Sequence, residues 1–480
     1  MIPNDHAELV VHRAREAAKF WWSKDMQYRM DKLHQLQKAF LLHHDQFIDA
    51  IVKDIQQPPI DALAAEILPI LDTLHYYRKH APRLLSRQHR RSPWYMWGAR
   101  SMVEYMPYGV VLIIAPWNFP LQLSFIPAIC ALAAGNAVII KPSEQLQHVP
   151  QAIMDMLKDA MLPSNLIQVV TGGPNVAKEL ISSHPDKIFF TGRESSGKSV
   201  AKLAAQSGIP TALELSGNSP MIVFADANLK RAAKAAVWGG FFHAGQVCIS
   251  IERIYVETSV QSQFTELLIE EAKKLKPYTP SFHDQEENSL YQDGDLGPIL
   301  METDWVRLNR LLDNAIHQGA TIAWGKTEND DFPYFPPTVL ISATDSMEIM
   351  NEETFGPLVA VTPFSKEDEV IKRINAGRFG LNVTIFTSDH KKGERIASQL
   401  QTGCCVINDV IRNISNSDLP FGGVKASGYG RYRGSEGLYE FTQTKSIMIH
   451  SGKRTREINW FPYQIKNLKA LQKLLKWWYR

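Results

Sequence analysis

The chain alternates between stretches with helical periodicity and short, continuously apolar runs. The first 80 residues or so follow the helical period throughout. From Tyr108 onward, helix-like stretches separate four apolar runs: YGVVLIIAP (108–116), AVIIKPSE (137–144), LIQVVTGG (166–173) and KIFFTG (187–192). Apolar runs rich in β-branched residues are typical of parallel strands that are buried on both faces. The pattern therefore predicts an α/β fold with a doubly wound sheet, whose ligand crevice lies at the carboxyl ends of the strands.

Composition narrows the class of protein. A chain of 480 residues is too long for one ordinary core and predicts two or three domains. With 45% hydrophobic residues and a formal net charge of +2, it is typical of a soluble protein for which nucleic acid is not an expected partner. The polar N-terminus and the lack of a membrane-spanning apolar run favour the cytoplasm. Its four cysteines show no paired metal-ligand spacing, so neither a disulfide scaffold nor a metal site is expected.

Two residues in separate segments form the most specific candidate chemistry. Cys248 lies in FHAGQVCIS (242–250), and Glu214 lies in LELSGNSP (213–220). The glycine and glutamine before Cys248 predict a tight loop, where backbone N–H groups lower the pKa of the thiol and hold an oxyanion. A thiolate that attacks a carbonyl forms a covalent intermediate, which an activated water must later release. Glu214 is the candidate base for that water.

A phosphate-binding loop is the alternative interpretation. Residues 192–199 read GRESSGKS, which matches GxxxxGK[ST], follows a predicted strand and precedes a predicted helix. The apolar run MIVFAD (221–226) would then end in a magnesium-binding aspartate. A glycine-rich turn that opens a helix binds a dinucleotide pyrophosphate equally well. A P-loop nucleotide hydrolase therefore stays open as the second function.

Seven sequence blocks occur in the order in which aldehyde dehydrogenases have them, and the chain resembles that family over nearly its whole length. The blocks are WNFP, KPSE, FTGxxxxG, LELSG, GQxC, EETFGP and PFGGVKASGYG. Such an ordered set is far more specific than any single block. The short N-terminus, the segment NDVIRNISNSDLPFGGV (408–424) and the YRG after Gly430 resemble the class 3 branch, which includes fatty, aromatic and coniferyl aldehyde dehydrogenases.

The resemblance implies a role for each matching residue. Cys248 would be the nucleophile, the Asn118 amide would stabilise the oxyanion with the Cys248 backbone N–H, and Glu214 would activate the hydrolytic water. NAD would accept the hydride, and NADP stays open as a second coenzyme. The cofactor contacts that the resemblance implies are Lys141 and Glu144 for the adenosine ribose, Gly192 and Gly197 for the pyrophosphate, and Glu353 and Phe355 for the nicotinamide ribose and ring.

Three positions depart from the usual family pattern. Arg193 stands in place of the serine of FTGS, His243 in place of an asparagine, and Asn218 in place of a frequent lysine. We expect Arg193 to contact the pyrophosphate or a 2′-phosphate, and we interpret His243 as a buried or hydrogen-bonded residue. Glu144 should repel a 2′-phosphate, so a preference for NAD with measurable activity on NADP is expected.

The resemblance and the periodicity together predict a Rossmann-like cofactor-binding domain, an α/β catalytic domain and a small β oligomerisation unit. The boundaries are 1–85 and 106–213 for the NAD(P)-binding domain, 214–407 for the catalytic domain, 86–105 and 408–450 for the β unit, and 451–480 for a C-terminal tail. Residues 92–107 and 437–450 are expected to form strands. Edge strands of this kind favour pairing with a second copy, so a homodimer is expected.

The tail and the substrate are the least determined features. Lys466, Lys469, Lys473 and Lys476 share one face of an amphipathic helix, whose leucines lie largely on another face. Packing against a catalytic domain, peripheral contact with a membrane surface, and a cap over the substrate tunnel all stay open. The aromatic and aliphatic residues around the predicted catalytic groups imply an apolar approach for the substrate. A medium-chain, long-chain or aromatic aldehyde is expected, rather than a short hydrophilic one.

Overall fold

The computed structural model describes residues 4–280, 292–327 and 330–479. The chain divides into two compact units. The first contains Met1–Leu84 and Pro107–Gln443, and the second contains Leu85–Met106 and Thr444–Arg480. Residues 408–443, which sequence reasoning assigns to the β unit, lie in the first of these units, while residues 444–450 lie in the second. The functional division of the chain stays a prediction.

A six-stranded sheet within the described residues forms the centre of the first half of unit one. Its order is β17 (Gly428–Tyr429), β7 (Thr211–Glu214), β6 (Lys187–Thr191), β3 (Val110–Ile114), β4 (Ala137–Lys141) and β5 (Ile167–Val169). All neighbours run parallel except β17, which pairs antiparallel with β7. Every residue of β3, β4 and β6 is buried. The predicted parallel strands are therefore confirmed at all four apolar runs.

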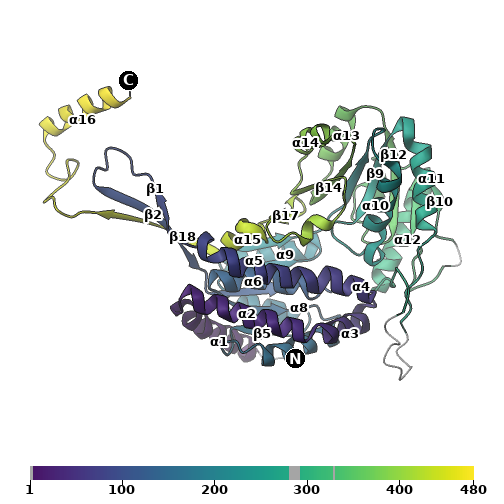
Figure 1. The fold of residues 1–480 in the computed structure, drawn as a ribbon, viewed down its shortest axis with the longest axis horizontal. Coiled ribbons are helices and arrows are strands. Elements are labelled where there is room, and N and C mark those ends of the chain that lie inside the picture. Colours follow the sequence, from purple (N-terminus) through teal and green to yellow (C-terminus); the bar gives the residue numbers. More distant parts are fainter. Residues whose placement is uncertain (1–3, 281–291, 328–329, 480) are drawn as a thin grey trace. The chain divides into compact units, whose positions relative to one another are not determined.

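Helices cover this sheet and account for the predicted helical N-terminal region. They are α1 (Asn4–Ser23), α2 (Met26–Leu42), α3 (His44–Ile55), α4 (Pro59–Asp61), α5 (Leu68–Leu84), α6 (Gln122–Ala134), α7 (His148–Asp159), α8 (Pro174–Ser182), α9 (Glu194–Gln206) and α15 (Gly434–Glu440), with a π-helical turn at Ala62–Ile67. Helix α6 is buried at every position and packs against α5, as Figure 1 shows. It follows the WNFP loop directly, so its rigid packing fixes where that loop begins and ends.

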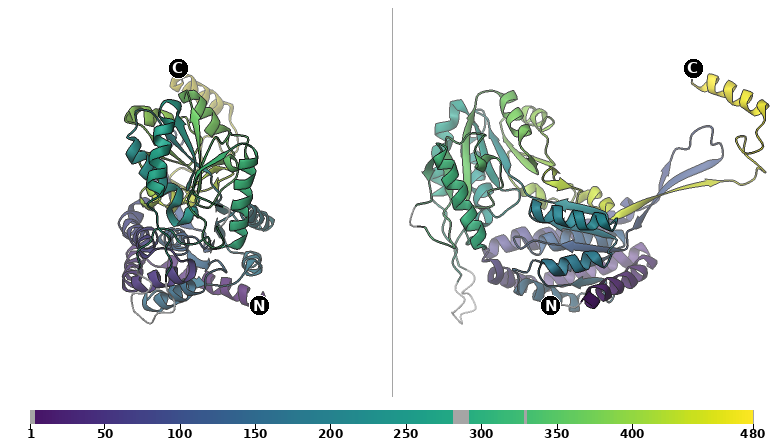
Figure 2. Two further views of the ribbon diagram at one scale, coloured as in Figure 1. Left: turned by 90° about the vertical axis from the view of Figure 1, so that its right-hand side faces the viewer. Right: turned by 180° about the vertical axis from the view of Figure 1, so that it is seen from behind.

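A second, seven-stranded sheet of described residues carries the other half of unit one. Its order is β10 (Thr321–Trp324), β11 (Thr338–Ile341), β12 (Leu358–Phe364), β9 (Ile251–Glu257), β8 (Ser219–Val223), β14 (Asn382–Phe386) and β15 (Cys404–Ile407), all parallel except β10. Helices lie on both faces, as Figure 2 shows: α10 (Leu229–Phe241), α11 (Gln261–Ala272), α12 (Glu302–His317), α13 (Glu367–Ala376) and α14 (His390–Ala397). Short 3-10 turns occur at Phe242–Gly245, Thr258–Val260, Glu348–Met350 and Arg412–Ser415, and β13 (Phe379–Gly380) pairs with β16 (Val424–Lys425).

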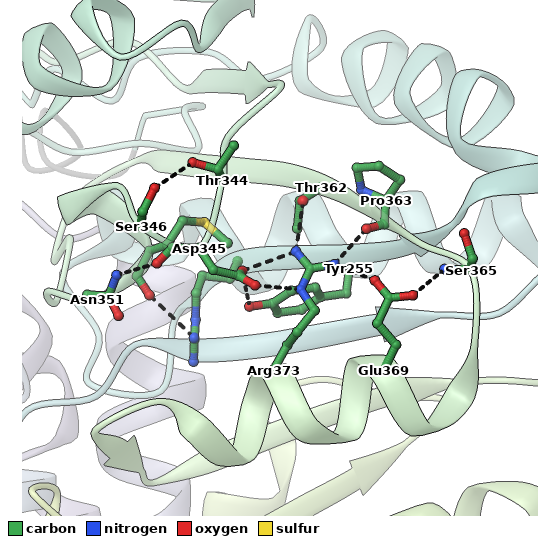
Figure 3. A network of polar contacts seen from close by, with 12 residues as sticks. Tyr255, Thr344, Asp345, Ser346, Asn351, Thr362, Pro363, Ser365, Glu369 and Arg373 are labelled. Carbon is green, nitrogen blue, oxygen red and sulfur yellow. Dashed lines mark hydrogen bonds and ion pairs between the residues drawn. The ribbon is translucent and has the colours of Figure 1, made fainter.

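A polar network around Arg373 ties this sheet to the segment that leads into EETFGP (Figure 3). The guanidinium of Arg373, on α13, donates to Asp345 Oδ2 at 2.6 Å and to the carbonyl of Pro363 at 2.7 Å. It also lies over the ring of Tyr255, 4.7 Å from its centroid. Asn351 Nδ2 donates to the carbonyl of Asp345 at 2.7 Å. The segment before EETFGP is thus held by hydrogen bonds from the charged guanidinium of Arg373. Such bonds are stronger than those between neutral groups.

The second unit consists of a small sheet and a terminal helix. Strands β1 (Gln88–Arg90), β2 (Ala99–Pro107) and β18 (Thr442–His450) pair in that order, and α16 (Ile465–Trp478) follows. Two expectations about these segments were too broad. Residues 92–98 contain no strand and form turns at 94–98, with Gly98 at φ +87°, and residues 437–440 belong to α15. In the part of the chain that the structure describes, no helix is long and apolar enough to cross a membrane.

Candidate active site

A cavity of about 740 Å³ lies where the loops of both sheets of unit one meet. The predicted residues that line it are Asn118, Lys141, Glu144, Gly192, Glu214, Cys248, Glu353 and Phe355. Gly197 is not among the described residues of its wall. It lies buried in α9, where a Cβ would stand 2.3 Å from Leu215 Cδ2. Its lack of a side chain therefore allows α9 to pack closely against Leu215. The remaining predicted residues come together from distant parts of the sequence.

The loop that carries Cys248 is tightly constrained. After α10 the backbone takes left-handed φ values at His243 (+51°), Ala244 (+53°) and Gly245 (+70°). A Cβ on Gly245 would lie 2.2 Å from the carbonyl oxygen of Gly356, and one on Gly217 would lie 2.2 Å from the carbonyl oxygen of Cys248. Side chains are excluded at both glycines, because the neighbouring atoms are backbone. The loop is therefore clamped between the LELSG and EETFGP segments.

Asn118 is held in one orientation by the loop that carries Cys248. Its Nδ2 donates to the carbonyl of Gln246 at 2.9 Å. The Gln246 side chain is itself fixed, since its Nε2 donates to the carbonyl of Pro298 at 3.1 Å and its Oε1 accepts from the Leu300 N–H at 3.0 Å. An amide nitrogen carries two hydrogens, so one N–H of Asn118 is left for an oxyanion. Rigid donors of this kind stabilise developing charge without reorganisation.

Glu214 ends β7 and is 4% exposed. Neither carboxylate oxygen has a hydrogen-bond partner among the residues that the structure describes. Burial raises the pKa of Glu214 well above its ordinary value, the Arg431 guanidinium opposes this shift, and Glu440 adds to it. A buried carboxylate with a raised pKa and free oxygens has the properties of a general base. Its role in this chain stays a prediction.

The ionisation of Cys248 differs from the sequence-based expectation. Burial raises the pKa of its thiol well above the ordinary value, and the carboxylates of Glu353 and Glu214 raise it further. The backbone N–H of Cys248 does lower the pKa, as predicted, but the other effects outweigh it. The lowering effect of the backbone is therefore present, but the pKa of the thiol as a whole is raised. Sequence reasoning could not find this, because both carboxylates come from other segments.

The cofactor side of the cavity has the groups that a dinucleotide needs. Lys141 is buried and its Nζ lies 3.1 Å from Glu144 Oε2, so a cation and an anion stand side by side at the wall. Helix α9 opens at Glu194 without a side-chain cap, which leaves its first N–H groups for a phosphate. The buried Oγ1 of Thr191 also has no partner within the described part of the chain. These residues fit the ribose and pyrophosphate of NAD.

The EETFGP turn is held by two residues that sequence reasoning missed. Glu252, buried on β9, accepts N–H bonds from Thr354 at 2.8 Å and Phe355 at 2.9 Å. Arg307, on α12, donates to the carbonyls of Glu353 at 2.7 Å and Thr354 at 2.8 Å. The available signal for Glu252 was its position, beside Arg253, within the otherwise largely apolar run ISIERIYV that follows Cys248. Opposed clamps on N–H and carbonyl groups hold Phe355 at its left-handed φ of +45°.

Glu252→Ala is expected to raise KM for NAD by roughly tenfold or more, because two hydrogen bonds to the turn are lost and each contributes about 0.5–1.5 kcal/mol. Glu252→Gln should restore part of the affinity, since one oxygen remains to accept. Steady-state kinetics and NAD titration by fluorescence would measure both variants. An unchanged KM in a folded Glu252→Ala protein would contradict the positioning role. Glu270→Ala, on the exposed side of α11, is the matched control.

The three departures from the family pattern have different surroundings. His243 is 1% exposed, so the predicted buried histidine is confirmed, and burial lowers its pKa to about 3. Asn218 Nδ2 donates to the carbonyl of Glu352 at 2.6 Å and supports the turn. Arg193 lines the cavity and forms an ion pair with the buried Asp304, which also pairs with Arg307. A phosphate contact by Arg193 stays a prediction.

Comparison with known proteins shows the family to which this chain belongs. The aldehyde dehydrogenase family matches residues 2–447. The chain belongs to the aldehyde dehydrogenase family. It is 40% identical to a 4,4'-diapolycopene aldehyde oxidase from Methylomonas, over 97% of this chain and 86% of that protein, and 34% identical to a 4,4'-diaponeurosporen-aldehyde dehydrogenase from Staphylococcus aureus, over 94% and 96%. Among solved structures, aldehyde dehydrogenase PutA from Anabaena variabilis superposes with a TM-score of 0.88 at 32% identity, covering 96% of each chain.

Further members of the family bear on the cofactor. A betaine aldehyde dehydrogenase from Staphylococcus aureus, solved in complex with NAD+, has a TM-score of 0.87 and 30% identity over 95% of this chain and 90% of its own. As an aldehyde dehydrogenase, the protein oxidises an aldehyde with NAD(P) as cofactor. The P-loop alternative has no support: Lys198 pairs with Glu194 at 2.7 Å, is 71% exposed, and is not among the described residues of the cavity wall. A P-loop lysine would reach into a phosphate cradle.

Proposed function

We propose that this aldehyde dehydrogenase oxidises a long or aromatic apolar aldehyde to its carboxylic acid. An aromatic path next to the catalytic loop supports this. Phe119, the neighbour of Asn118, stacks on Phe242 with 6.0 Å between ring centroids, and Phe242 meets Trp238 at 5.2 Å. Trp238 is 41% exposed, so a row of contacting aromatic rings extends from solvent to the buried residue beside Asn118. Such a wall favours apolar over hydrophilic substrates.

Two of the relatives agree with this substrate class. They are named for the aldehydes of diapolycopene and diaponeurosporene, which are apolar carotenoid aldehydes. Others are named as NADP-dependent succinate-semialdehyde dehydrogenases, whose substrate is short and acidic. The aromatic path favours the first kind for this chain, because aromatic side chains do not compensate the desolvation of a charged substrate.

The chemistry follows from the residues on the cavity wall. The Cys248 thiolate adds to the aldehyde carbon, and the new oxyanion accepts hydrogen bonds from Asn118 Nδ2 and the Cys248 backbone N–H. NAD, when it is bound, would accept the hydride that leaves the former aldehyde carbon. The carbon then remains attached to the Cys248 sulfur as a thioester. A water molecule that gives its proton to Glu214 then attacks the thioester carbon, and the acid leaves as the Cys248 sulfur is released. Glu252 and Arg307 hold the turn that faces the cofactor, and they take no part in proton transfer.

NADH formation with a panel of aldehydes tests the substrate class. We expect kcat/KM for decanal and coniferyl aldehyde to exceed that for acetaldehyde by roughly tenfold or more, because each buried methylene contributes about 0.8 kcal/mol. The value should be higher with NAD than with NADP, since Glu144 stands at the ribose end of the cavity. Phe242→Ala should lower the preference for decanal. Phe20→Ala, which removes an exposed aromatic of α1, should not. Equal rates on all aldehydes would contradict the proposal.

We further propose that the enzyme is a cytoplasmic homodimer that pairs through β18. This strand is the last of its sheet in the described residues, so its outer N–H and C=O groups are available to a second copy. Sedimentation velocity at micromolar concentration should give a dimer. Met448→Pro, which removes an N–H from this strand, should shift the population towards monomer. A monomer in the unaltered protein would contradict the proposal.

A further inference from the structure

Charge is unevenly distributed along this chain. Residues 451–480 contain eight lysines and arginines and one acidic residue, which gives a net charge of +7, whereas the whole chain has +2. Residues 1–450 therefore carry −5. The other segments of the second unit, 85–106 and 444–450, add five basic residues and one glutamate, so this unit carries +11. A near-neutral protein thus has one strongly cationic part.

Helix α16 separates this charge from apolar surface. At 100° per residue, Lys466, Lys469, Lys473 and Lys476 fall within about 80° of one another, and Leu468, Leu471, Leu474, Leu475 and Trp478 centre on the opposite side. Leu468 and Leu475 are more than half exposed. No residue of α16 is buried in the described chain. A helix with this face pattern and an exposed apolar side is typical of one that lies in a membrane interface.

Large aromatic side chains gather in the same unit. Five of the eleven tryptophans of the protein occur in its 59 residues. Trp97 is 80% exposed and Phe461 is 77% exposed, and Trp94 stacks on Trp478 with 5.2 Å between centroids. Tryptophan and tyrosine favour the headgroup level of a bilayer, where the ring is apolar and the N–H or O–H stays hydrated. Long lysine side chains reach from an apolar face to the charged headgroups.

We propose that the second unit is a peripheral membrane-binding surface that recognises anionic phospholipid, with α16 lying in the interface. The family model matches residues 2–447 and therefore ends before the tail. Strand β18 ends at His450, so pairing along this strand involves no residue of α16. Resting on the proposed function, this surface would place the enzyme where apolar aldehydes are dissolved.

Vesicle sedimentation with the full-length protein tests the surface directly. Vesicles of equal parts phosphatidylglycerol and phosphatidylcholine should bind the protein at least about tenfold more strongly than phosphatidylcholine alone, and added salt should weaken binding. Replacing the four α16 lysines with glutamine should lower the partition coefficient roughly 100-fold or more, because each basic residue near an anionic surface increases the binding constant by roughly fivefold. Tryptophan fluorescence should shift to the blue on binding.

A charge-matched variant separates this effect from net charge. Lys202, Lys230, Lys234 and Lys273 are exposed on α9, α10 and the end of α11, and their replacement by glutamine removes the same charge. This variant should bind vesicles like the unaltered protein. Equal binding to neutral and anionic vesicles, or no binding at all, would overturn the proposal. So would a lysine variant of α16 that loses the dimer, because a second copy would then be the partner of the helix.

A soluble-substrate assay keeps the two proposals distinct. Oxidation of a short aldehyde in the absence of vesicles should be the same for the unaltered protein and both lysine variants, which also shows that they fold. Vesicle binding without a preference for apolar aldehydes would leave the membrane surface standing and overturn the substrate class. Apolar preference without vesicle binding would do the reverse.

Discussion

Cys248→Ser is expected to lower kcat for NADH formation by roughly 10⁴-fold or more, because the covalent step requires a sulfur nucleophile and removal of such a group costs most of the catalysis. Serine keeps the size of the side chain, so the left-handed loop around it should be preserved. Steady-state kinetics with decanal and NAD would measure the loss. Cys405→Ser, on β15 and outside the described cavity wall, is the matched control and should keep full activity.

The raised pKa of Cys248 gives this prediction a pH dependence. A thiol whose pKa lies above the working pH is mostly protonated, so its thiolate fraction grows roughly tenfold per pH unit. Alkylation of the cofactor-free protein by iodoacetamide should therefore accelerate steadily from pH 7 into the alkaline range, without a plateau near neutrality. Mass spectrometry would confirm that Cys248 is the modified residue. Fast, pH-independent alkylation would show that the pKa is lowered instead.

The buried strands could be predicted because a parallel strand covered on both faces is encoded by a nearly continuous run of apolar residues. Runs such as 110–114 and 137–141 contain little but β-branched and aliphatic residues, and the structure has strands there. Pattern fails where the same residue types occur in other settings. Residues 437–440 (GLYE) open the segment that was predicted as strand, yet Gly437 packs against Tyr432 as part of α15. Tertiary packing, rather than local preference, decides that segment.

The candidate site shows the same division. Eight of the nine predicted residues line one cavity, because ordered family blocks carry information on position that composition lacks. The supports of those residues carry no such signal. Glu252 and Arg307 act on backbone groups of a turn about 100 and 50 residues away, and the pKa of Cys248 depends on Glu353 and Glu214. Distances between segments of this separation arise from the fold and are not visible in the sequence.

Glu214→Gln is expected to separate acylation from hydrolysis. Glutamine has nearly the same shape but cannot accept a proton, so Cys248 should still form the thioester while its release slows by roughly 10²- to 10⁴-fold. Stopped-flow measurement should give a burst of about one NADH per active site, followed by a slow steady rate. The acyl adduct on Cys248 should then be visible by mass spectrometry. A variant without a burst would contradict the assignment, because Glu214 would then be needed before the thioester forms.

The environment of Glu214 fixes the direction of its pH profile. Burial without hydrogen-bond partners favours the neutral acid, so its pKa lies above the ordinary value and the base form is gained only as pH rises. Hydrolysis of the thioester should therefore quicken with pH through the neutral range in the unaltered enzyme, whereas the slow phase of Glu214→Gln should lack this rise. Glu270→Gln, on the exposed side of α11, should keep the profile of the unaltered enzyme. If hydrolysis of the thioester is independent of pH both in the unaltered enzyme and in Glu214→Gln, the proton of the attacking water goes to another acceptor.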